Sequence, residues 1–142
     1  SRSFIEWSKT NFSLNSLSPE NHEFRVMDSR EYLAWAAKKG QQFDLVICDP
    51  PSFSRSKTGG VFRIDKDFES LLNQLNTVTR PGGRILFALN FEGWTVEDFA
   101  KRLKKWLVQS KAGRLTPAPT PDWDFELPGA KRQMKSAFIE KF

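Results

Sequence analysis

The stretch of the sequence that is best suited to chemistry is residues 49–53, which read Asp49-Pro50-Pro51-Ser52-Phe53. A proline fixes φ at about −65° and has no backbone N–H, so this loop is stiff and its carbonyl groups remain free as acceptors. The aspartate adds a fixed negative charge, and the phenylalanine offers a flat face on which a base can stack. An acceptor pair beside a ring suits a planar substrate with hydrogen-bond donors, such as an extruded nucleobase. The alternative is a rigid exit from a strand, with the phenylalanine in the core.

A second acidic residue, Asp28, lies where a predicted strand over 24–27 gives way to a helix. The spacing in Asp28-Ser29-Arg30-Glu31 is that of a capping box, in which the acid at position 28 begins the helix. The plain interpretation is therefore a helix N-cap, although a capping carboxylate can also contact a ligand.

Basic side chains follow the first stretch. Arg55 and Lys57 lie in a polar segment, residues 52–60, that is predicted to be a loop. Basic groups beside a base-binding pocket would hold RNA phosphates, and a solvated loop is the alternative. His22 is the single histidine, and we expect no catalytic or metal-binding role for it.

Composition favours one basic, globular domain. The chain has 142 residues, 39% of them hydrophobic, and a formal net charge of +5. A chain of this length can bury a core, and its charge fits an anionic partner. The apolar runs are too short to span a bilayer, and Cys48 is the only cysteine, which excludes a disulfide framework. We therefore expect a cytoplasmic location, no membrane contact and no metal.

The elements that would position these residues alternate along the chain. Hydrophobic spacing predicts helices over residues 1–15, 28–39, 65–79 and 95–110, and strands over 24–27, 43–48, 84–90 and 134–142. The strand over 43–48 shows no alternation, so we expect it to be covered on both faces, as in a parallel sheet. The order implies an α/β fold with a doubly wound, mostly parallel sheet and a terminal antiparallel strand. In such sheets ligands bind beyond the carboxyl ends of the strands, which is where Asp49 lies.

The stretch at 49–53 resembles motif IV, Asp/Asn-Pro-Pro-x, of the class I S-adenosylmethionine-dependent methyltransferases that modify bases. With Ser54, Ser56 and Lys57 it is more similar to the large-subunit ribosomal RNA methyltransferases of the K/L and I type. Three further segments stand where that family has matching ones: Phe43-Asp44-Leu45, Arg80-Pro81-Gly82-Gly83 and Asp122-x-Asp124-Phe125. The resemblance covers nearly the whole chain and implies the Rossmann-like fold of that class.

This resemblance implies S-adenosyl-L-methionine as the cofactor and a base of ribosomal RNA as the substrate. The residues that it implies for catalysis are Asp49, Pro50, Pro51 and Phe53. Those that it implies for cofactor binding are Ser1, Arg2, Asp28, Ser29 and Asp49, and the carboxylate at position 28 would accept a hydrogen bond from the adenine amine. Those that it implies for RNA binding are Ser52, Arg55, Lys57 and Asn90.

The next predicted strand bears on which atom would be methylated. Methylation of cytosine C5 needs a thiolate that adds to the ring, and the family's C5 enzymes carry a cysteine where this chain has residues 87–90, without one. A ring or exocyclic nitrogen needs only alignment with the methyl donor. The K-type enzymes methylate guanine N7 of 23S rRNA, which is our specific expectation, with Asn90 orienting the base. Adenine N6 stays open, because the acceptors of the motif suit an amine equally well.

Two parts of the class I pattern are not found in the sequence. These are a glycine-rich turn after the first strand and an acid that ends the second, which hold the methionine part and the ribose of the cofactor. Ser1-Arg2-Ser3 resembles the residues just after that acid. We therefore expect residues 1–142 to be the C-terminal portion of a single methyltransferase catalytic domain, with weak cofactor binding or none by itself. The first two strands would belong between 24–27 and 43–48.

Two other functions remain open at this point. The chain could be a non-catalytic RNA-binding or assembly module that retains the methyltransferase fold, in which case RNA binding would depend on salt and cofactor affinity would be lost. It could also be a methyltransferase of small molecules, against which the basic segment argues only mildly.

Overall fold

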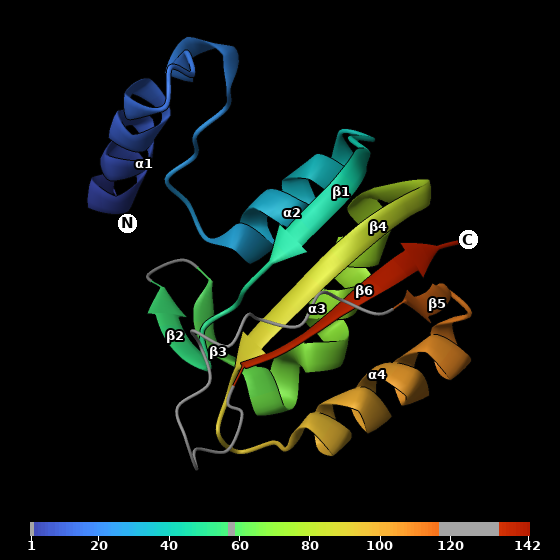
Figure 1. The fold of residues 1–142 in the computed structure, drawn as a ribbon. Helices are drawn as coiled ribbons and strands as arrows, with labels where there is room; N and C mark the ends of the chain where they lie inside the picture. Colours follow the sequence, from blue (N-terminus) through green and yellow to red (C-terminus); the bar gives the residue numbers. More distant parts are fainter. Residues whose placement is uncertain (1, 57–58, 117–133) are drawn as a thin grey trace.

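A four-stranded mixed sheet forms the centre of the computed structural model, which describes residues 2–56, 59–116 and 134–142. The strands, in their order across the sheet, are β1 (Phe43–Cys48), β4 (Thr79–Asn90), β6 (Met134–Lys141) and β5 (Gly113–Thr116), as Figure 1 shows. β1 and β4 are parallel, whereas β6 is antiparallel to both of its neighbours. The α/β fold and the terminal antiparallel strand expected from the sequence are confirmed.

Three helices cover one face of this sheet: α2 (Ser29–Lys38), α3 (Ile64–Val78) and α4 (Val96–Ser110). Alternate side chains of β4, namely Ile85, Phe87 and Leu89, are fully buried and share one core with the apolar stripes of the helices. The helices predicted over 28–39, 65–79 and 95–110 are therefore confirmed to within one residue at each end.

The first helix, α1 (Arg2–Leu14), stands apart from the sheet in Figure 1, and the short helix η1 (Pro19–Asn21) follows it. The ring of Phe12 contacts those of His22 and Phe24, with centroids 4.8 and 5.2 Å apart. The helix predicted over 1–15 is confirmed for the described residues. None of the helices described is both long and apolar enough to cross a membrane.

The second face of the sheet is only partly covered by the described residues, which corrects the expectation for β1. Ile47 is 67% exposed and Leu45 47% exposed, although both belong to the apolar run. Ile47 lies beside Leu86, and Leu86 beside Phe138, so an apolar row crosses this face. Among the described residues, α2, α3 and α4 all pack on the opposite face, so the second layer expected over β1 is not found in this part of the chain.

The prediction of a strand over 24–27 was also wrong. These residues have no regular secondary structure and belong to neither sheet, and β1 pairs only with β4 among the described residues. A strand is stabilised by hydrogen bonds to a neighbour, which residue type alone does not supply. Residues 24–27 therefore form an irregular segment that leads into α2.

The polar segment over 52–60 contributes to a β-hairpin rather than to a loop. β2 (Phe53–Ser56) pairs antiparallel with β3 (Gly60–Arg63), with Ser54 opposite Phe62. The hairpin directs Phe62, which is 4% exposed, into the core. A buried side chain of β3 thus fixes a hairpin whose first strand is polar.

Candidate functional site

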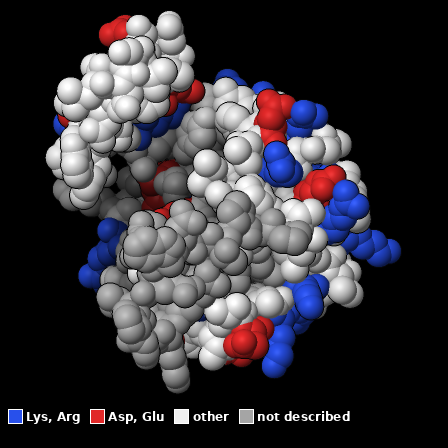
Figure 2. Space-filling model, in the orientation of Figure 1, with Lys and Arg blue, Asp and Glu red and all other residues white. Residues whose placement is uncertain are grey.

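A cavity of about 280 Å³ lies at the carboxyl end of β1, beside the start of α2. It is lined by residues from both elements and from the hairpin: Asp28, Ser29, Arg30, Ile47, Cys48, Asp49, Pro50, Pro51, Ser54, Phe62 and Leu71. Asp28 and Asp49, the two acids selected from the sequence, therefore share one cavity. On the face shown in Figure 2, acidic side chains lie in the depth of a hollow between α1 and the body of the molecule.

Asp28 begins α2 as its N-cap, as predicted, but it caps the helix through Arg30 rather than Glu31. Its Oδ1 accepts hydrogen bonds from the backbone N–H of Arg30 at 2.9 Å and from the Nε of the same residue at 3.2 Å. Its Oδ2 accepts from Arg30 Nη2 at 2.9 Å and from Ser56 Oγ at 2.8 Å. The carboxylate is thus held by its own helix and by the hairpin.

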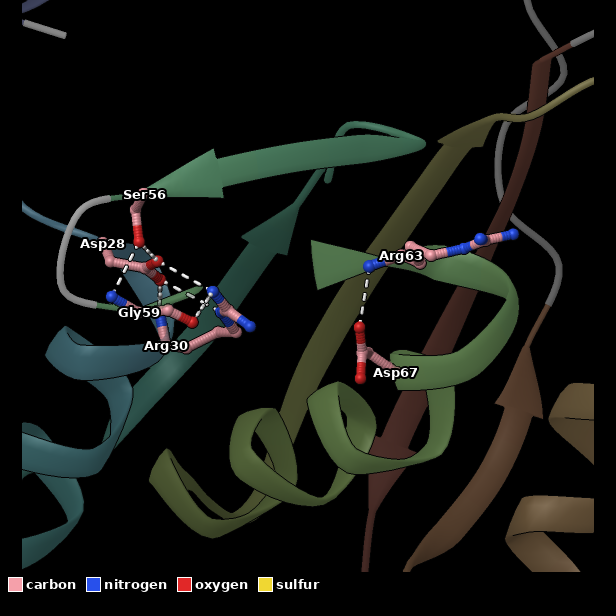
Figure 3. Close-up of polar contacts among 6 residues, drawn as sticks. All are labelled: Asp28, Arg30, Ser56, Gly59, Arg63 and Asp67. Carbon is pink, nitrogen blue, oxygen red and sulfur yellow. Dashed lines mark hydrogen bonds and ion pairs between the residues drawn. The ribbon is translucent and has the colours of Figure 1, made fainter. Parts of the chain in front are cut away.

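The turn of the hairpin completes this set of contacts, which Figure 3 shows. Arg30 Nη2 also donates to the carbonyl of Gly59 at 2.7 Å, and the N–H of Gly59 donates to Ser56 Oγ at 2.8 Å. We call the four residues Asp28, Arg30, Ser56 and Gly59 the Asp28 network. It joins the beginning of α2 to the turn between β2 and β3.

The surroundings of Asp28 keep its carboxylate ionised. Hydrogen bonding from the Arg30 side chain holds the pKa of Asp28 well below its usual range, against the opposing effect of burial, and Ser56 adds to the lowering. The side chain of Asp28 is only 8% exposed, and that of Arg30 is 22% exposed. The site therefore contains a fixed negative charge that is largely shielded from solvent.

Asp49 differs from Asp28 in being exposed, and it follows β1 directly. Pro50 is half-buried and Pro51 exposed, and both line the cavity beside it. Cys48 precedes them, and burial, with a smaller contribution from the charge of Asp49, raises the pKa of its thiol to about 12. The thiol of Cys48 is therefore protonated at neutral pH, which makes it a poor nucleophile.

The end of β4 lies beside the Pro-Pro exit. Ser52 Oγ donates to the backbone carbonyl of Asn90 at 3.0 Å, although 38 residues separate them in the chain. Phe53 is 60% exposed and Arg55 is also exposed, and neither lines the cavity. The structure thus brings Ser52 and Asn90 together, while Phe53 and Arg55 extend along β2.

Some predicted site residues are not brought to the cavity. Arg2 is exposed at the beginning of α1 and is not among the residues that line the cavity. Ser1, Lys57 and the segment 122–125 lie outside the described residues. Among the residues that the structure does describe, no group of three or more side chains could hold a metal ion.

Four residues of this site were not predicted from the sequence: Arg30, Ser56, Gly59 and Phe62. Three of these lie in the segment treated as a loop or just after it, and their contacts with α2 depend on the hairpin. The pair Gly59-Gly60 was the available signal, because two glycines between short polar and apolar runs are typical of a hairpin turn. Gly60 indeed has a φ of +69°.

No family model matches the chain. The chain is 40% identical over 88 residues to YwbD of Bacillus subtilis (strain 168), which is named as a candidate ribosomal RNA large subunit methyltransferase. The aligned part covers 62% of this chain and 22% of YwbD.

Solved structures of methyltransferases match this chain over more of its length than YwbD does. The crystal structure of SMU.776, a candidate methyltransferase complexed with SAH, matches with a TM-score of 0.76 at 28% identity and covers 94% of this chain and 35% of that one. A candidate SAM-dependent methyltransferase from Streptococcus mutans matches with a TM-score of 0.77 at 26% identity, covering 94% and 34%. A SAM-dependent methyltransferase from Agrobacterium tumefaciens shares the fold at 18% identity, with a TM-score of 0.73 and coverage of 99% and 46%.

The chain therefore spans 22% of the length of the curated relative and between a third and a half of these solved structures. The resemblance to class I S-adenosylmethionine-dependent methyltransferases is confirmed in both sequence and fold.

Proposed function

We propose that this chain is part of an enzyme that transfers a methyl group from S-adenosyl-L-methionine to a base of ribosomal RNA. The observation that carries the proposal is the cavity in which Asp28 and Asp49 meet at the carboxyl end of β1. Ligands bind at that end of the strands in open α/β sheets. The similarity to YwbD and to SMU.776 supports the same class of reaction.

The residues of the cavity fit the adenine end of the cofactor. Asp28 supplies a carboxylate that accepts hydrogen bonds, as an adenine amine requires, and Ser29 lies beside it. Ile47 and Leu71 line the same cavity with apolar surface against which a flat ring can pack. When bound, the cofactor would supply the methyl group.

The exit of β1 would hold the base. Asp49 and the free carbonyl of Pro50 would accept hydrogen bonds from its amine or imide groups, and Phe53 would stack on its face. Asn90 would help to orient the base, because Ser52 ties the backbone of Asn90 to this exit. Arg55 and Lys57 would contact phosphates of the RNA.

The chemistry of the site favours a nitrogen atom as the acceptor of the methyl group. Cytosine C5 methylation needs a thiolate, and the thiol of Cys48, with a pKa raised to about 12, does not supply one at neutral pH. A nitrogen lone pair needs positioning only. Among the nitrogen atoms of the bases, guanine N7 of 23S rRNA is the acceptor that we propose. This atom carries no proton, so Asp49 would hold the base rather than remove a proton.

The test is methyl incorporation by the full-length protein and its Asp49→Ala variant, with 23S rRNA and labelled S-adenosyl-L-methionine. We expect incorporation to fall by at least about 10²-fold, because an acceptor aimed at the reacting base is lost, while circular dichroism shows an unchanged fold. Nucleoside mass spectrometry should identify the wild-type product as 7-methylguanosine.

The matched control is Asp44→Ala, which changes an exposed aspartate at the other end of β1 that pairs with Arg80. This variant should keep wild-type incorporation. Full activity of Asp49→Ala would contradict the proposed role of the motif. Detection of N6-methyladenosine as the product would replace guanine N7 by adenine N6 as the proposed acceptor.

A further inference from the structure

The carboxylate of Asp28 has no free acceptor position in this structure. A carboxylate offers about four lone-pair sites, and Asp28 receives four hydrogen bonds, three from Arg30 and one from Ser56. Its side chain is also only 8% exposed. An amine that approaches from the cavity must therefore displace one of these donors.

Ser56 is the donor that is most easily displaced. Arg30 belongs to the same helix as Asp28, carries a positive charge and binds both carboxylate oxygens, and such charge-assisted bidentate contacts are the strong ones. Ser56 is neutral, comes from a different element and makes a single contact with Oδ2. The incoming amine would thus take the position of the Ser56 hydroxyl.

We propose that Ser56 docks the β2–β3 hairpin on Asp28 and that the adenine amine of the cofactor competes with it for Oδ2, so that cofactor binding releases the hairpin turn. This inference rests on the proposed function, because it requires that Asp28 binds the cofactor. Ser56 is a positioning residue in this account, since it acts on the cofactor through Asp28.

Release of Ser56 would also affect Gly59. Ser56 Oγ also accepts the N–H of Gly59, and Arg30 binds the carbonyl of the same glycine. A Cβ atom built on Gly59 would overlap Asp28 Oδ2 and lie 2.8 Å from Ser56 Oγ, so the docked position admits only glycine. The hairpin also carries Phe53 and Arg55, so its release would couple cofactor binding to the RNA-contacting strand.

The adenine amine and the Ser56 hydroxyl compete for Oδ2 of Asp28. Each therefore weakens the binding of the other by the same free energy. In the wild type, cofactor binding has to break the Ser56 contact, whereas in Ser56→Ala it does not. A hydrogen bond to a charged group contributes about 1.5 kcal/mol, so Ser56→Ala should bind S-adenosylhomocysteine about tenfold more tightly than the wild type. Gly59→Ala should change the affinity in the same direction, because its Cβ expels the turn from Asp28.

The experiment is isothermal titration of the full-length protein with S-adenosylhomocysteine, combined with hydrogen exchange of the peptide that covers the hairpin. In the wild type, the ligand should accelerate exchange in the hairpin, which is the opposite of the protection that a purely structural contact would give. In Ser56→Ala, exchange should be fast already and unchanged by the ligand. The control is Val61→Thr, on the exposed side of the same hairpin, which should behave like the wild type.

Two results would overturn the inference, and they differ from one another. If the wild type binds S-adenosylhomocysteine but Ser56→Ala binds it equally or more weakly, the competition is wrong and the proposed function stands. If the wild type fails to bind S-adenosylhomocysteine at all, the proposed function fails and the inference fails with it.

Discussion

Among single residues, Asp28 should make the stability of the fold depend on pH. Hydrogen bonds from Arg30 lower the pKa of the Asp28 carboxyl in the folded state, whereas in the unfolded chain it returns to an ordinary value of about 3.9. The ionised carboxylate therefore stabilises the fold above about pH 4, and this contribution is lost as the pH falls through the lower, folded-state pKa.

We predict that Asp28→Asn is less stable than the wild type at pH 7, by about 2 kcal/mol, because contacts to a charged acceptor are lost. The difference should shrink as the pH is lowered from about 4.5 towards 2, since protonation removes the same contribution from the wild type. Urea unfolding at a series of pH values measures both effects.

Asp65→Asn is the matched control for this pH dependence. Asp65 lies in the first turn of α3 and pairs with an arginine two residues away, Arg63, at 3.0 Å. However, its side chain is 35% exposed, compared with 8% for Asp28, so solvent screens the pair. A pH dependence for Asp65→Asn as steep as that for Asp28→Asn would show that burial of Asp28 does not matter.

At the scale of elements, the β2–β3 hairpin separates what the sequence could predict from what it could not. The types and positions of Asp28 and Asp49 were sufficient to select them, because both follow predicted strands and precede a helix or a stiff loop. Ser56 could not be selected in the same way. Its contact with Asp28 spans 28 residues and depends on a hairpin whose first strand, Phe53–Ser56, is mostly polar.

Helices and central strands were predicted well because their apolar spacing is dense, as in α3, where Phe68, Leu71, Leu72 and Leu75 are all buried. The prediction of a strand over 24–27 was wrong, although the residue types of this segment suit a strand. Strand formation depends on a neighbour in space, and no local pattern reports whether one is present.

The hairpin also permits a direct test of how it is anchored. Phe62 is 4% exposed, and its ring lies 5.5 Å from the guanidinium of Arg30. We predict that Phe62→Ala destabilises the protein by about 3 to 5 kcal/mol, the usual cost of removing a buried phenylalanine. Urea unfolding, together with hydrogen exchange of the hairpin, measures this effect.

Val61→Ala provides the comparison on the neighbouring position of β3. Val61 is 45% exposed, so its loss should cost less than about 1 kcal/mol. Equal destabilisation by the two variants would mean that the hairpin is not anchored through its inner face.

For the molecule as a whole, the two faces of the sheet and the net charge bear on which surfaces would contact the proposed RNA substrate. The helices α2, α3 and α4 occupy one face, and the cavity lies at the carboxyl end of β1, where α2, α3 and the hairpin also line it. The hairpin extends from the same end and carries Arg55. A net charge of +5 attracts RNA to the entire surface, so the contribution of the hairpin has to be separated from this general attraction.

The salt dependence of RNA binding makes that separation. Each phosphate contact on single-stranded RNA contributes about 0.7 to the slope of log K against log salt concentration. We predict that Arg55→Gln in the full-length protein lowers the slope by about one such contact, whereas Arg80→Gln, at the opposite end of the sheet and paired with Asp44, leaves it unchanged. Filter binding of a 23S rRNA fragment over a series of salt concentrations measures both slopes. Equal slopes for wild type and Arg55→Gln would mean that RNA does not contact the hairpin at Arg55.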